Sequence, residues 1–389
     1  MENQVYIVSG CRTGIGSFLG QYSNISSVTL GATVIEEALK RANIKTDEID
    51  QVIMGQVLTN GVGQNPARQA MLKVGIPLDV PAFTLNMVCG SGLKSVYEGH
   101  NAIKAGEAKI IVSGGMENMT MAKHIVSGRV GTKLGNLTLE DTILADGLTD
   151  PMIKLHMGDT AEYLAKTYNV SREEQDNFAL ESQTRARNAT ANNHFKPEII
   201  GVKNPKGGLI ETDEYIRAST TIEDLKKLPP RFQTDGSVTA ANASGINDSA
   251  AAVVICSGDV VRAKNLIPLA RIVAFAESGC EPIEMGLGPI KSVRKVVEKA
   301  GWKMDEVDLF ELNEAFAVQS IIVVKSLGID MSKVNVSGGA LSLGHPIGAS
   351  GTRILVTLIY NMIRLGKTKG VASLCIGGGM GIAIAIQRD

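Results

Sequence analysis

Residues 86–94 read Asn86-Met87-Val88-Cys89-Gly90-Ser91-Gly92-Leu93-Lys94, and the rest of the chain is organised around them. An apolar extended segment precedes this stretch and helical spacing follows it, so Cys89 is expected where a turn becomes a helix. Free backbone N–H groups and the positive end of a helix lower the pKa of a thiol. Gly90 and Gly92 would leave room for a substrate beside the sulfur. The stretch predicts a nucleophilic cysteine, although a lone cysteine is more often a small buried side chain.

The composition is that of a large and nearly neutral globular protein. With 389 residues, the chain exceeds the size at which one core keeps growing, so we expect two or three domains. Lys and Arg number 39 against 40 Asp and Glu, a net charge of −1, which argues against a general binder of nucleic acid or of anionic membranes. Aromatic residues make up only 4%, so a base-stacking surface is not expected.

The cysteines and the two terminal segments of the sequence favour a soluble, cytoplasmic protein. The five cysteines are scattered without CxxC spacing, which predicts neither a zinc site nor a disulfide framework. The first residues lack the charged and apolar regions of a signal peptide. The uncharged stretch 370–386 has three glycines at its centre and alternating isoleucines, so two buried strands around a turn are favoured over a membrane span. We expect a cytoplasmic protein that binds no metal.

Strands and helices alternate through the first part of the chain. The apolar patterns predict strands at 5–9, 52–56 and 109–113, and helices at 29–42 and 66–74. Such alternation is typical of a layered α/β domain.

The character of the chain changes between about residues 118 and 247. Charge rises, polar loops lengthen, and isolated helices are predicted at 158–168 and 171–193, the latter with Ser171 as N-cap and Glu174 three residues on. Residues 226–232, which contain two consecutive prolines, cannot form regular structure. We interpret this region as an insertion over the core that serves a binding site or a subunit contact.

The pattern of the first part begins again near residue 269. An opening strand, a helix at 292–300, an aspartate-containing segment at 307–310, a glycine-rich helix start at 348–351 and a strand before three glycines repeat in the same order. The chain is therefore predicted to contain two similar halves. The boundaries are 1–118 with 248–267 for the first half, 119–247 for an inserted loop domain, and 268–389 for the second half.

Three polar clusters in the second half could meet Cys89. They are Asn313-Glu314-Ala315-Phe316, Gly344-His345-Pro346-Ile347-Gly348 and Cys375-Ile376-Gly377-Gly378-Gly379. A histidine activates a nearby thiol, and an asparagine is a neutral donor to an oxyanion or an ordered water. A second cysteine suits a separate proton transfer at the carbon α to a thioester. Taken singly, each residue could equally be structural, with His345 in a turn and Asn313 as a cap.

These clusters, together with the segment around Cys89, resemble the signature motifs of the thiolases. The resemblance extends to residues 61–68 and 113–117 and so covers essentially the full chain. It implies a thiolase fold, in which two similar βαβαβαββ halves pack in layers (αβαβα) with an inserted loop domain. The sequence is most similar to the biosynthetic branch, which condenses two acetyl-CoA to acetoacetyl-CoA. The alternative is the degradative branch, which cleaves longer 3-ketoacyl-CoA chains.

The resemblance also implies roles for the motif residues. Cys89 would take the acyl group, His345 would activate its thiol, and Cys375 would act as acid and base on the second acetyl-CoA. Asn313 with a water, together with His345, resembles the oxyanion hole for the enolate. The backbone N–H groups of Cys89 and Gly377 resemble a second hole, for the tetrahedral intermediate of acyl transfer.

A further group of residues falls on positions that contact coenzyme A in the family. Here CoA is substrate and product, and the resemblance implies no other cofactor and no metal. The segment before Phe232 departs from the family's usual Arg-Pro, since Pro229-Pro230-Arg231 stands there. Lys226, Lys227 and Arg231 are interpreted as a solvated loop. The predicted CoA-contacting residues are Leu148, His156, Met157, Arg217, Phe232 and Ser244, with Met285 and Phe316 as pocket walls.

Other members of this broad class are less consistent with the chain. The related ketosynthases replace the second cysteine by His or Asn, so Cys375 argues against them. A non-catalytic CoA-binding relative would lack at least one of Cys89, Asn313, His345 and Cys375, and all are present. The family resemblance also implies a homotetramer built from tight dimers, with tetramer contacts in the region after Met121.

Overall fold

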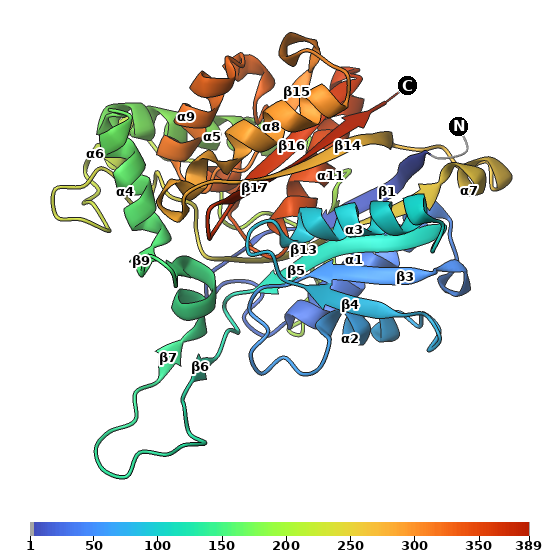
Figure 1. Cartoon of the computed structure of the whole chain (residues 1–389), viewed down its shortest axis with the longest axis horizontal. Coiled ribbons are helices and arrows are strands. Elements are labelled where there is room, and N and C mark those ends of the chain that lie inside the picture. Colours follow the sequence, from blue (N-terminus) through green and yellow to red (C-terminus); the bar gives the residue numbers. More distant parts are fainter. Residues whose placement is uncertain (1–3, 389) are drawn as a thin grey trace.

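The computed structural model describes residues 4–388, and its two halves share one strand order (Figure 1). The first half has the order β4-β3-β5-β13-β1, in which β3, β4 and β5 are parallel neighbours and β13 is antiparallel to β5 and β1. The strands of this half are β1 (Val5–Thr13), β3 (Gln51–Gly55), β4 (Ala82–Leu85), β5 (Ile110–Asn118) and β13 (Asn247–Ser257), with β2 (Gly16–Ser17) paired to β13.

The second half repeats this strand order, except that the counterpart of β4 is reduced to a single β-bridge. Its order is β15-β16-β17-β14, and a single parallel bridge from Phe310 to Val334 stands where the first half has β4. The side chain of Asn335 explains the short pairing, because it accepts from the N–H of Leu312 and donates to its carbonyl, both at 2.8 Å. A neighbouring strand that continued to pair with β15 would need the same backbone N–H and carbonyl groups of Leu312. The strands are β14 (Ala270–Gly279), β15 (Leu309–Leu312), β16 (Lys369–Ile376) and β17 (Met380–Gln387).

Helices cover both faces of each half. α1 (Ser27–Ala42) and α2 (Pro66–Lys73) lie on the outer face of the first half, and α8 (Gly288–Lys299) and α9 (Ala317–Leu327) lie on the outer face of the second. α3 (Ser91–Ala105) and α11 (Ser350–Leu365) pack against each other between the halves. The layers therefore follow the order α, β, α, β, α, and the predicted thiolase fold is confirmed. β1 pairs with β14, which joins the halves into one 11-stranded sheet.

Successive side chains along a strand point to opposite faces of the sheet, so each strand contributes to two separate parts of the hydrophobic core. In β3, Val52 and Met54 face the α1 and α2 layer, whereas Ile53 faces α3 and α11. β13 alternates in the same way. A strand buried on both faces needs no polar position, which is why these segments read as continuous apolar runs.

One aspartate in each half fastens the start of a strand. Asp50 accepts the backbone N–H groups of Lys109 and Ile110 at 2.7 and 2.9 Å, just where β5 begins. Asp308 accepts the N–H groups of Thr368 and Lys369 at 3.0 and 2.9 Å, where β16 begins. The repeat predicted from the sequence thus extends to individual hydrogen bonds.

The two central helices approach closely at glycines. A Cβ on Gly92 would lie 2.8 Å from the backbone nitrogen of Thr352, and one on Gly351 would overlap the backbone of Leu93. The Thr352 hydroxyl also donates to the carbonyl of Gly92 at 2.7 Å. A Cβ on Gly90 would lie 2.5 Å from Ile376. The expectation that Gly90 and Gly92 leave room for a substrate is therefore wrong, because these glycines let the second half pack against the start of α3.

The insertion between β5 and β13 packs mainly on the second half. Helix α5 begins after an N-cap at Ser171 that pairs with Glu174 in a capping box, as predicted. α4 and α5 both contact α9, and β10 pairs with β1. The elements of the insertion are β6 (His124–Ile125), β7 (Glu140–Asp141), a π-helical turn (Ile143–Leu148), β8 (Thr149–Asp150), β9 (Leu155–His156), α4 (Met157–Thr167), α5 (Arg172–Ala191), β10 (Ile199–Ile200), β11 (Val202–Lys203), β12 (Leu209–Ile210) and α6 (Ile222–Lys226).

Helix α9 was not predicted from the sequence. Almost every residue of Ala317–Leu327 is buried, so the helix carries no polar face and no helical period. Two short helices complete the fold, α7 (Gly258–Ala263) and α10 (Ala340–Leu343), together with 3-10 turns at Thr46–Glu48, Pro282–Leu287, Met304–Glu306 and Met331–Lys333.

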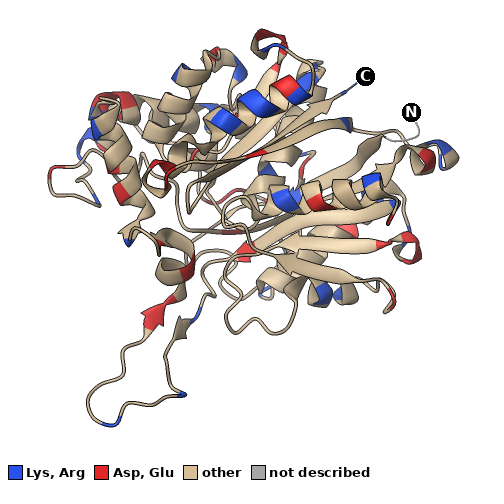
Figure 2. Cartoon of the chain, viewed as in Figure 1, with Lys and Arg blue, Asp and Glu red and all other residues tan. Residues whose placement is uncertain are grey.

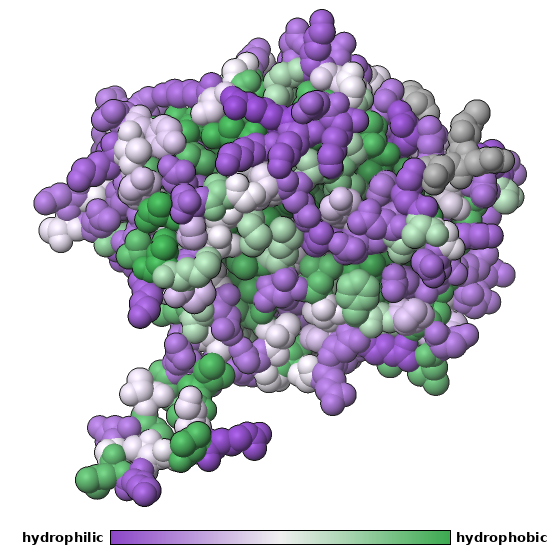
Figure 3. Space-filling model, viewed as in Figure 1, coloured by the Kyte–Doolittle hydropathy of each residue, from purple (hydrophilic) through white to green (hydrophobic). Residues whose placement is uncertain are grey.

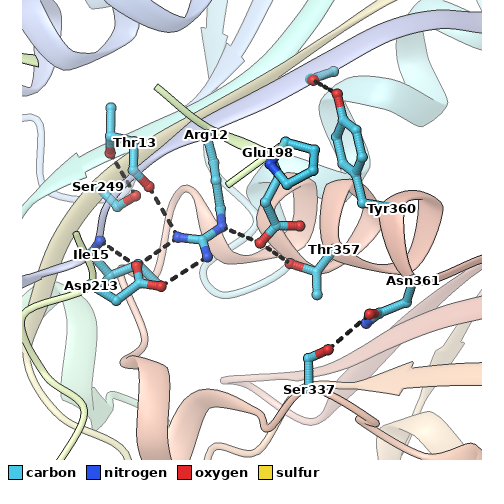
Figure 4. Close-up of polar contacts among 12 residues, drawn as sticks. Arg12, Thr13, Ile15, Glu198, Asp213, Ser249, Ser337, Thr357, Tyr360 and Asn361 are labelled. Carbon is cyan, nitrogen blue, oxygen red and sulfur yellow. Dashed lines mark hydrogen bonds and ion pairs between the residues drawn. The ribbon is translucent and has the colours of Figure 1, made fainter. Parts of the chain in front are cut away.

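A buried ion cluster ties β1 to the insertion (Figure 4). The Arg12 guanidinium, which is fully buried, donates to Glu198 at 2.7 Å and to both oxygens of Asp213 at 2.6 and 2.9 Å. Asp213 also accepts the N–H of Ile15 at 2.8 Å. The cluster fixes the segment that leads to Tyr215, which lies at the cavity described below.

Charged residues of both signs are dispersed along the outer elements, as the coloured ribbon of Figure 2 shows. This dispersal agrees with the near-zero net charge. Within residues 4–388, no helix is both long and apolar enough to cross a membrane.

Candidate active site

A cavity of about 370 Å³ lies where the two halves and the insertion meet. Cys89 comes from the first half, and His345 and Cys375 come from the second. All but two of the predicted site residues line this cavity, the exceptions being Asn313 and Gly377. The predicted residues in its lining are Cys89, Leu148, His156, Met157, Arg217, Phe232, Ser244, Met285, Phe316, His345 and Cys375.

The turn that carries Cys89 is held in an unusual conformation. Val88 has φ of 46°, a left-handed value that is rare for a β-branched residue. The Ser91 hydroxyl donates to the Val88 carbonyl at 2.7 Å and accepts the Met87 N–H at 2.8 Å. The Asn86 side chain accepts the Val88 N–H at 2.8 Å. These bonds hold a strained turn that presents the cysteine one residue before the N-cap of α3.

The Cys89 thiol is protonated in the free protein. Burial raises its pKa to about 11, and the backbone N–H groups of Gly377 and of Cys89 itself, which bond the sulfur, offset only part of that effect. The sequence-based expectation of a lowered pKa is therefore wrong for the resting state. Desolvation outweighs the helix end because the sulfur is enclosed by both halves. The predicted nucleophilic role of this sulfur would therefore require a base that removes its proton.

His345, the residue predicted to be that base, lines the same cavity as Cys89. Its backbone N–H is bound by Asn247 at 2.9 Å, and its Nδ1 lies 2.6 Å from the Ser350 hydroxyl. Burial, and to a lesser extent the nearby charge of Arg353, lowers the pKa of His345 to about 3. The imidazole is therefore neutral at physiological pH and can accept a proton.

Asn313 lies beside His345 rather than in the cavity wall. It follows β15 directly, and its Nδ2 is 3.4 and 3.5 Å from the two ring nitrogens of His345. Its Oδ1 lies 3.4 Å from the guanidinium of Arg353, which is fully buried. The amide is thus oriented with its nitrogen toward the histidine.

Cys375 is the second thiol of the cavity. It lies near the end of β16 and is 1% exposed. Burial and, secondarily, the neighbouring Cys89 raise the pKa of its thiol well above the ordinary value. Gly377, two residues on, lines a second hollow together with Val88 and Met157, and its backbone N–H bonds the Cys89 sulfur.

Aromatic rings form the wall of the cavity on the side of the insertion. His156 and Phe232 are stacked with ring centroids 4.9 Å apart, and Phe232 meets Phe316 edge-on at 6.4 Å. The stacking is close enough that any Cβ at Gly158 would overlap the Phe232 ring. His156 Nδ1 accepts the Gly158 N–H at 2.9 Å, so the neutral ring carries its proton on Nε2.

The comparisons with known proteins agree with this site. Residues 5–259 match the family model "Thiolase, N-terminal domain", and residues 266–388 match "Thiolase, C-terminal domain". The chain belongs to the thiolase family. It is 50% identical over 392 residues to the cytosolic acetyl-CoA acetyltransferase of Rattus norvegicus, covering 100% of this chain and 99% of the relative.

Two solved thiolase structures show the same fold over nearly the full chain. The acetyl-CoA acetyltransferase of Bacillus anthracis is 40% identical with a TM-score of 0.97, covering 99% of both chains. Human mitochondrial 3-ketoacyl-CoA thiolase in complex with CoA is 42% identical with a TM-score of 0.97, covering 100% of this chain and 98% of that one. Both branches of the family are thus represented among proteins of very similar structure.

Several residues of this thiolase cavity escaped the sequence analysis. Arg231, which we interpreted as solvated, lies exposed at the cavity, as does Arg217 above the Tyr215 ring. Arg217 and Arg231 belong to different segments of the insertion, so no short sequence motif contains both. The remaining unpredicted lining residues are mostly small or apolar, namely Met119, Gly147, Thr239, Ala240, Ala243, Gly245, Ile246, Ala315 and Ile347.

A buried carboxylate connects the two halves behind the cavity. Glu117 accepts the N–H groups of Val57, Leu58 and Gly348 at 3.0, 3.2 and 2.9 Å. Burial raises its pKa to about 7 despite these donors. Gly348 belongs to the His345 segment, so Glu117 holds that segment against the first half. Among residues 4–388, no group of three or more His, Cys, Asp or Glu side chains could hold a metal ion.

Proposed function

We propose that this thiolase is an acetyl-CoA C-acetyltransferase that reversibly condenses two acetyl-CoA to acetoacetyl-CoA and CoA. The observation that carries the proposal is that two thiols from different halves, Cys89 and Cys375, line one cavity beside a neutral histidine. Acyl transfer needs only one thiol, whereas carbon–carbon bond formation needs a second proton-transfer group. The name of the rat relative supports the same reaction.

In the first half-reaction, the Cys89 sulfur attacks the acetyl-CoA carbonyl as His345 takes its proton. The N–H groups of Cys89 and Gly377, which already bond the Cys89 sulfur, would donate to the oxyanion of the tetrahedral intermediate. CoA leaves with the proton of Cys375. The products are acetyl-Cys89, free CoA, and a Cys375 thiolate paired with the His345 imidazolium, in which the opposite charges would offset part of the cost that burial places on each.

In the second half-reaction, the Cys375 thiolate takes a proton from the α-carbon of a second acetyl-CoA. The high pKa of this buried thiol makes its thiolate a strong base, as a weakly acidic C–H requires. The His345 imidazolium, with Asn313 and a water, would stabilise the enolate oxygen. The enolate carbon attacks acetyl-Cys89, acetoacetyl-CoA forms, and the departing Cys89 sulfur recovers its proton from His345. All groups return to their starting protonation.

The test is CoA-dependent thiolysis of a 3-ketoacyl-CoA series from acetoacetyl-CoA upward. We expect kcat/KM to fall steeply beyond acetoacetyl-CoA, because the bulky side chains of Met157, Met285 and Phe316 bound the cavity. A flat or rising profile would assign the chain to the degradative branch. No turnover of any member would refute the proposed activity.

CoA would serve here as substrate and product, with no further cofactor. The insertion residues Leu148, His156, Phe232 and Ser244 would contact its pantetheine arm, and Arg217 and Arg231 at the exposed end of the cavity would face its phosphates. The CoA complex of the human thiolase supports this use of the cavity. A cytoplasmic location is proposed on the cytosolic name of the rat relative.

A homotetramer, a dimer of dimers, is proposed from the arm between β6 and β7. This arm extends away from the body and carries apolar side chains at its tip (Figures 1 and 3). Val130 is 95% and Leu134 is 93% exposed. Replacing both by Asp should convert tetramers to dimers in light scattering, whereas Ile267→Asp, at an equally exposed position away from the arm, should not. An unchanged mass in the arm variant would contradict this role.

A further inference from the structure

A buried hydroxyl stands at the first residue of α11. Ser350 is fully buried, and its Oγ lies 2.6 Å from Nδ1 of His345 and 2.9 Å from the carbonyl oxygen of Pro346. The hydroxyl is therefore within hydrogen-bond distance of two groups at once. Its own proton can satisfy only one of them.

The chemistry of the two neighbours decides where that proton lies. The Pro346 carbonyl oxygen can only accept, and it takes the Ser350 hydroxyl proton in addition to the backbone N–H groups of Ala349 and Ser350, which also lie at 2.9 Å. The opposite assignment would leave two oxygens 2.9 Å apart with no hydrogen between them. The Ser350 oxygen then accepts from His345, and the ring proton lies on Nδ1. Nε2 is left unprotonated, and the Asn313 amide nitrogen lies 3.5 Å from it.

Two further contacts limit rotation of the His345 ring. Asn247 binds the His345 backbone N–H at 2.9 Å, which fixes the base of the side chain. The Asn313 amide nitrogen lies within 3.5 Å of both ring nitrogens. The ring therefore has one orientation, and the Ser350 hydroxyl gives it one tautomer.

We propose that Ser350 is a positioning residue that fixes the Nδ1–H tautomer of His345, so that Nε2 is the atom that takes the proton of Cys89. This inference deepens the proposed function and rests on it for the role of His345 as base. A free imidazole populates both tautomers, and only the one with an unprotonated Nε2 could serve. Without the serine, a part of the molecules would carry the proton on the wrong nitrogen.

The chain offers a matched control for the loss of a buried hydroxyl. Ser292 is also fully buried in the first turns of a helix, α8, and its Oγ lies 3.3 Å from the carbonyl of Gly288, four residues back. Its other hydroxyl neighbour is Ser373, and no histidine accompanies it. Ser292→Ala therefore removes the same helix back-bond without touching a tautomer.

The first measurement is nitrogen NMR of protein labelled with ¹⁵N-histidine, which distinguishes protonated from unprotonated ring nitrogens. The chain has five histidines, and His345→Gln identifies the signals of interest. In the native chain and in Ser292→Ala we expect a protonated Nδ1 and an unprotonated Nε2 at His345. In Ser350→Ala we expect averaged or reversed signals, and in Ser350→Thr the native pattern should return.

The second measurement is acetylation of Cys89 by acetyl-CoA, followed by mass spectrometry. Ser350→Ala should slow acetylation by about 10- to 100-fold, with little change in KM. This is less than the roughly 10²- to 10⁴-fold expected for loss of the base itself, because part of the molecules keep the required tautomer. Ser350→Thr should recover most of the rate, and Ser292→Ala should keep it. Native His345 signals in Ser350→Ala would overturn the proposal, as would an unprotonated Nδ1 in the native chain. The NMR result requires no turnover, so failure of the proposed activity would be recognised separately.

Discussion

The Cys89 thiol should react slowly with iodoacetamide at neutral pH, in contrast to most nucleophilic cysteines. Only the thiolate is alkylated, and burial raises the pKa of this thiol to about 11. An unperturbed thiol with a pKa of about 8.5 is roughly one quarter thiolate at pH 8. A thiol with a pKa of about 11 is about one thousandth thiolate at that pH, so alkylation should be about 200-fold slower. The rate should rise tenfold per pH unit up to about pH 11.

The assay is the alkylation rate of Cys89 by mass spectrometry between pH 6 and 11, with glutathione as the unperturbed reference. Cys89→Ser gives the background from the partly buried Cys280. Acetyl-CoA should protect the site, because an acetylated sulfur cannot be alkylated. An inflection at or below pH 8.5 would refute the reasoning, and would mean that the helix end and the Gly377 N–H outweigh burial.

Three further predictions test the chemistry and the packing. Cys375→Ser should lower condensation by about 10²- to 10⁴-fold while the acylation half-reaction proceeds, measured by acetyl-enzyme formation against acetoacetyl-CoA formation; equal loss of both steps would contradict the separate roles. Gly351→Ala should lower the free energy of unfolding by about 1–3 kcal/mol in urea titrations, because its Cβ would overlap the backbone of α3. Gly128→Ala is the control and should change the free energy of unfolding little, because no atom lies within 4 Å of the added Cβ. Arg12→Met should lower the free energy of unfolding by about 3–5 kcal/mol, because two buried carboxylates lose their cation, and by less at lower pH, because burial raises the pKa of Glu198 and a protonated Glu198 needs no cation. Arg262→Ala, which breaks an exposed pair, should lower it by under about 1 kcal/mol, and an equal effect of the two changes would show that the buried cluster adds nothing.

The chemistry-bearing residues were recognisable from the sequence because their neighbours are distinctive. Cys89, His345 and Cys375 each stand among glycines directly after an apolar run, a pattern with few structural solutions. Helix α9 was missed for the opposite reason, since a helix buried on all sides has no polar face to mark its period. Arg231 is exposed, as predicted, but its position at the cavity was not foreseen, because a charged residue in a proline-rich loop carries no sign of the cavity it adjoins.

The sequence by itself determined the two similar halves, the insertion and the identity of the reacting groups, because alternation, periodicity and short motifs depend on neighbours along the chain. Only the tertiary structure decided how those groups behave. The raised pKa of Cys89, the neutral state of His345 and the hydroxyl acceptor that Ser350 offers to His345 all depend on the packed tertiary structure. Gly92 had a plausible local purpose, yet its true constraint is the backbone of Thr352, which is 2.8 Å from where a Cβ would lie. Desolvation and close packing are properties of the assembled layers, so no local pattern encodes them.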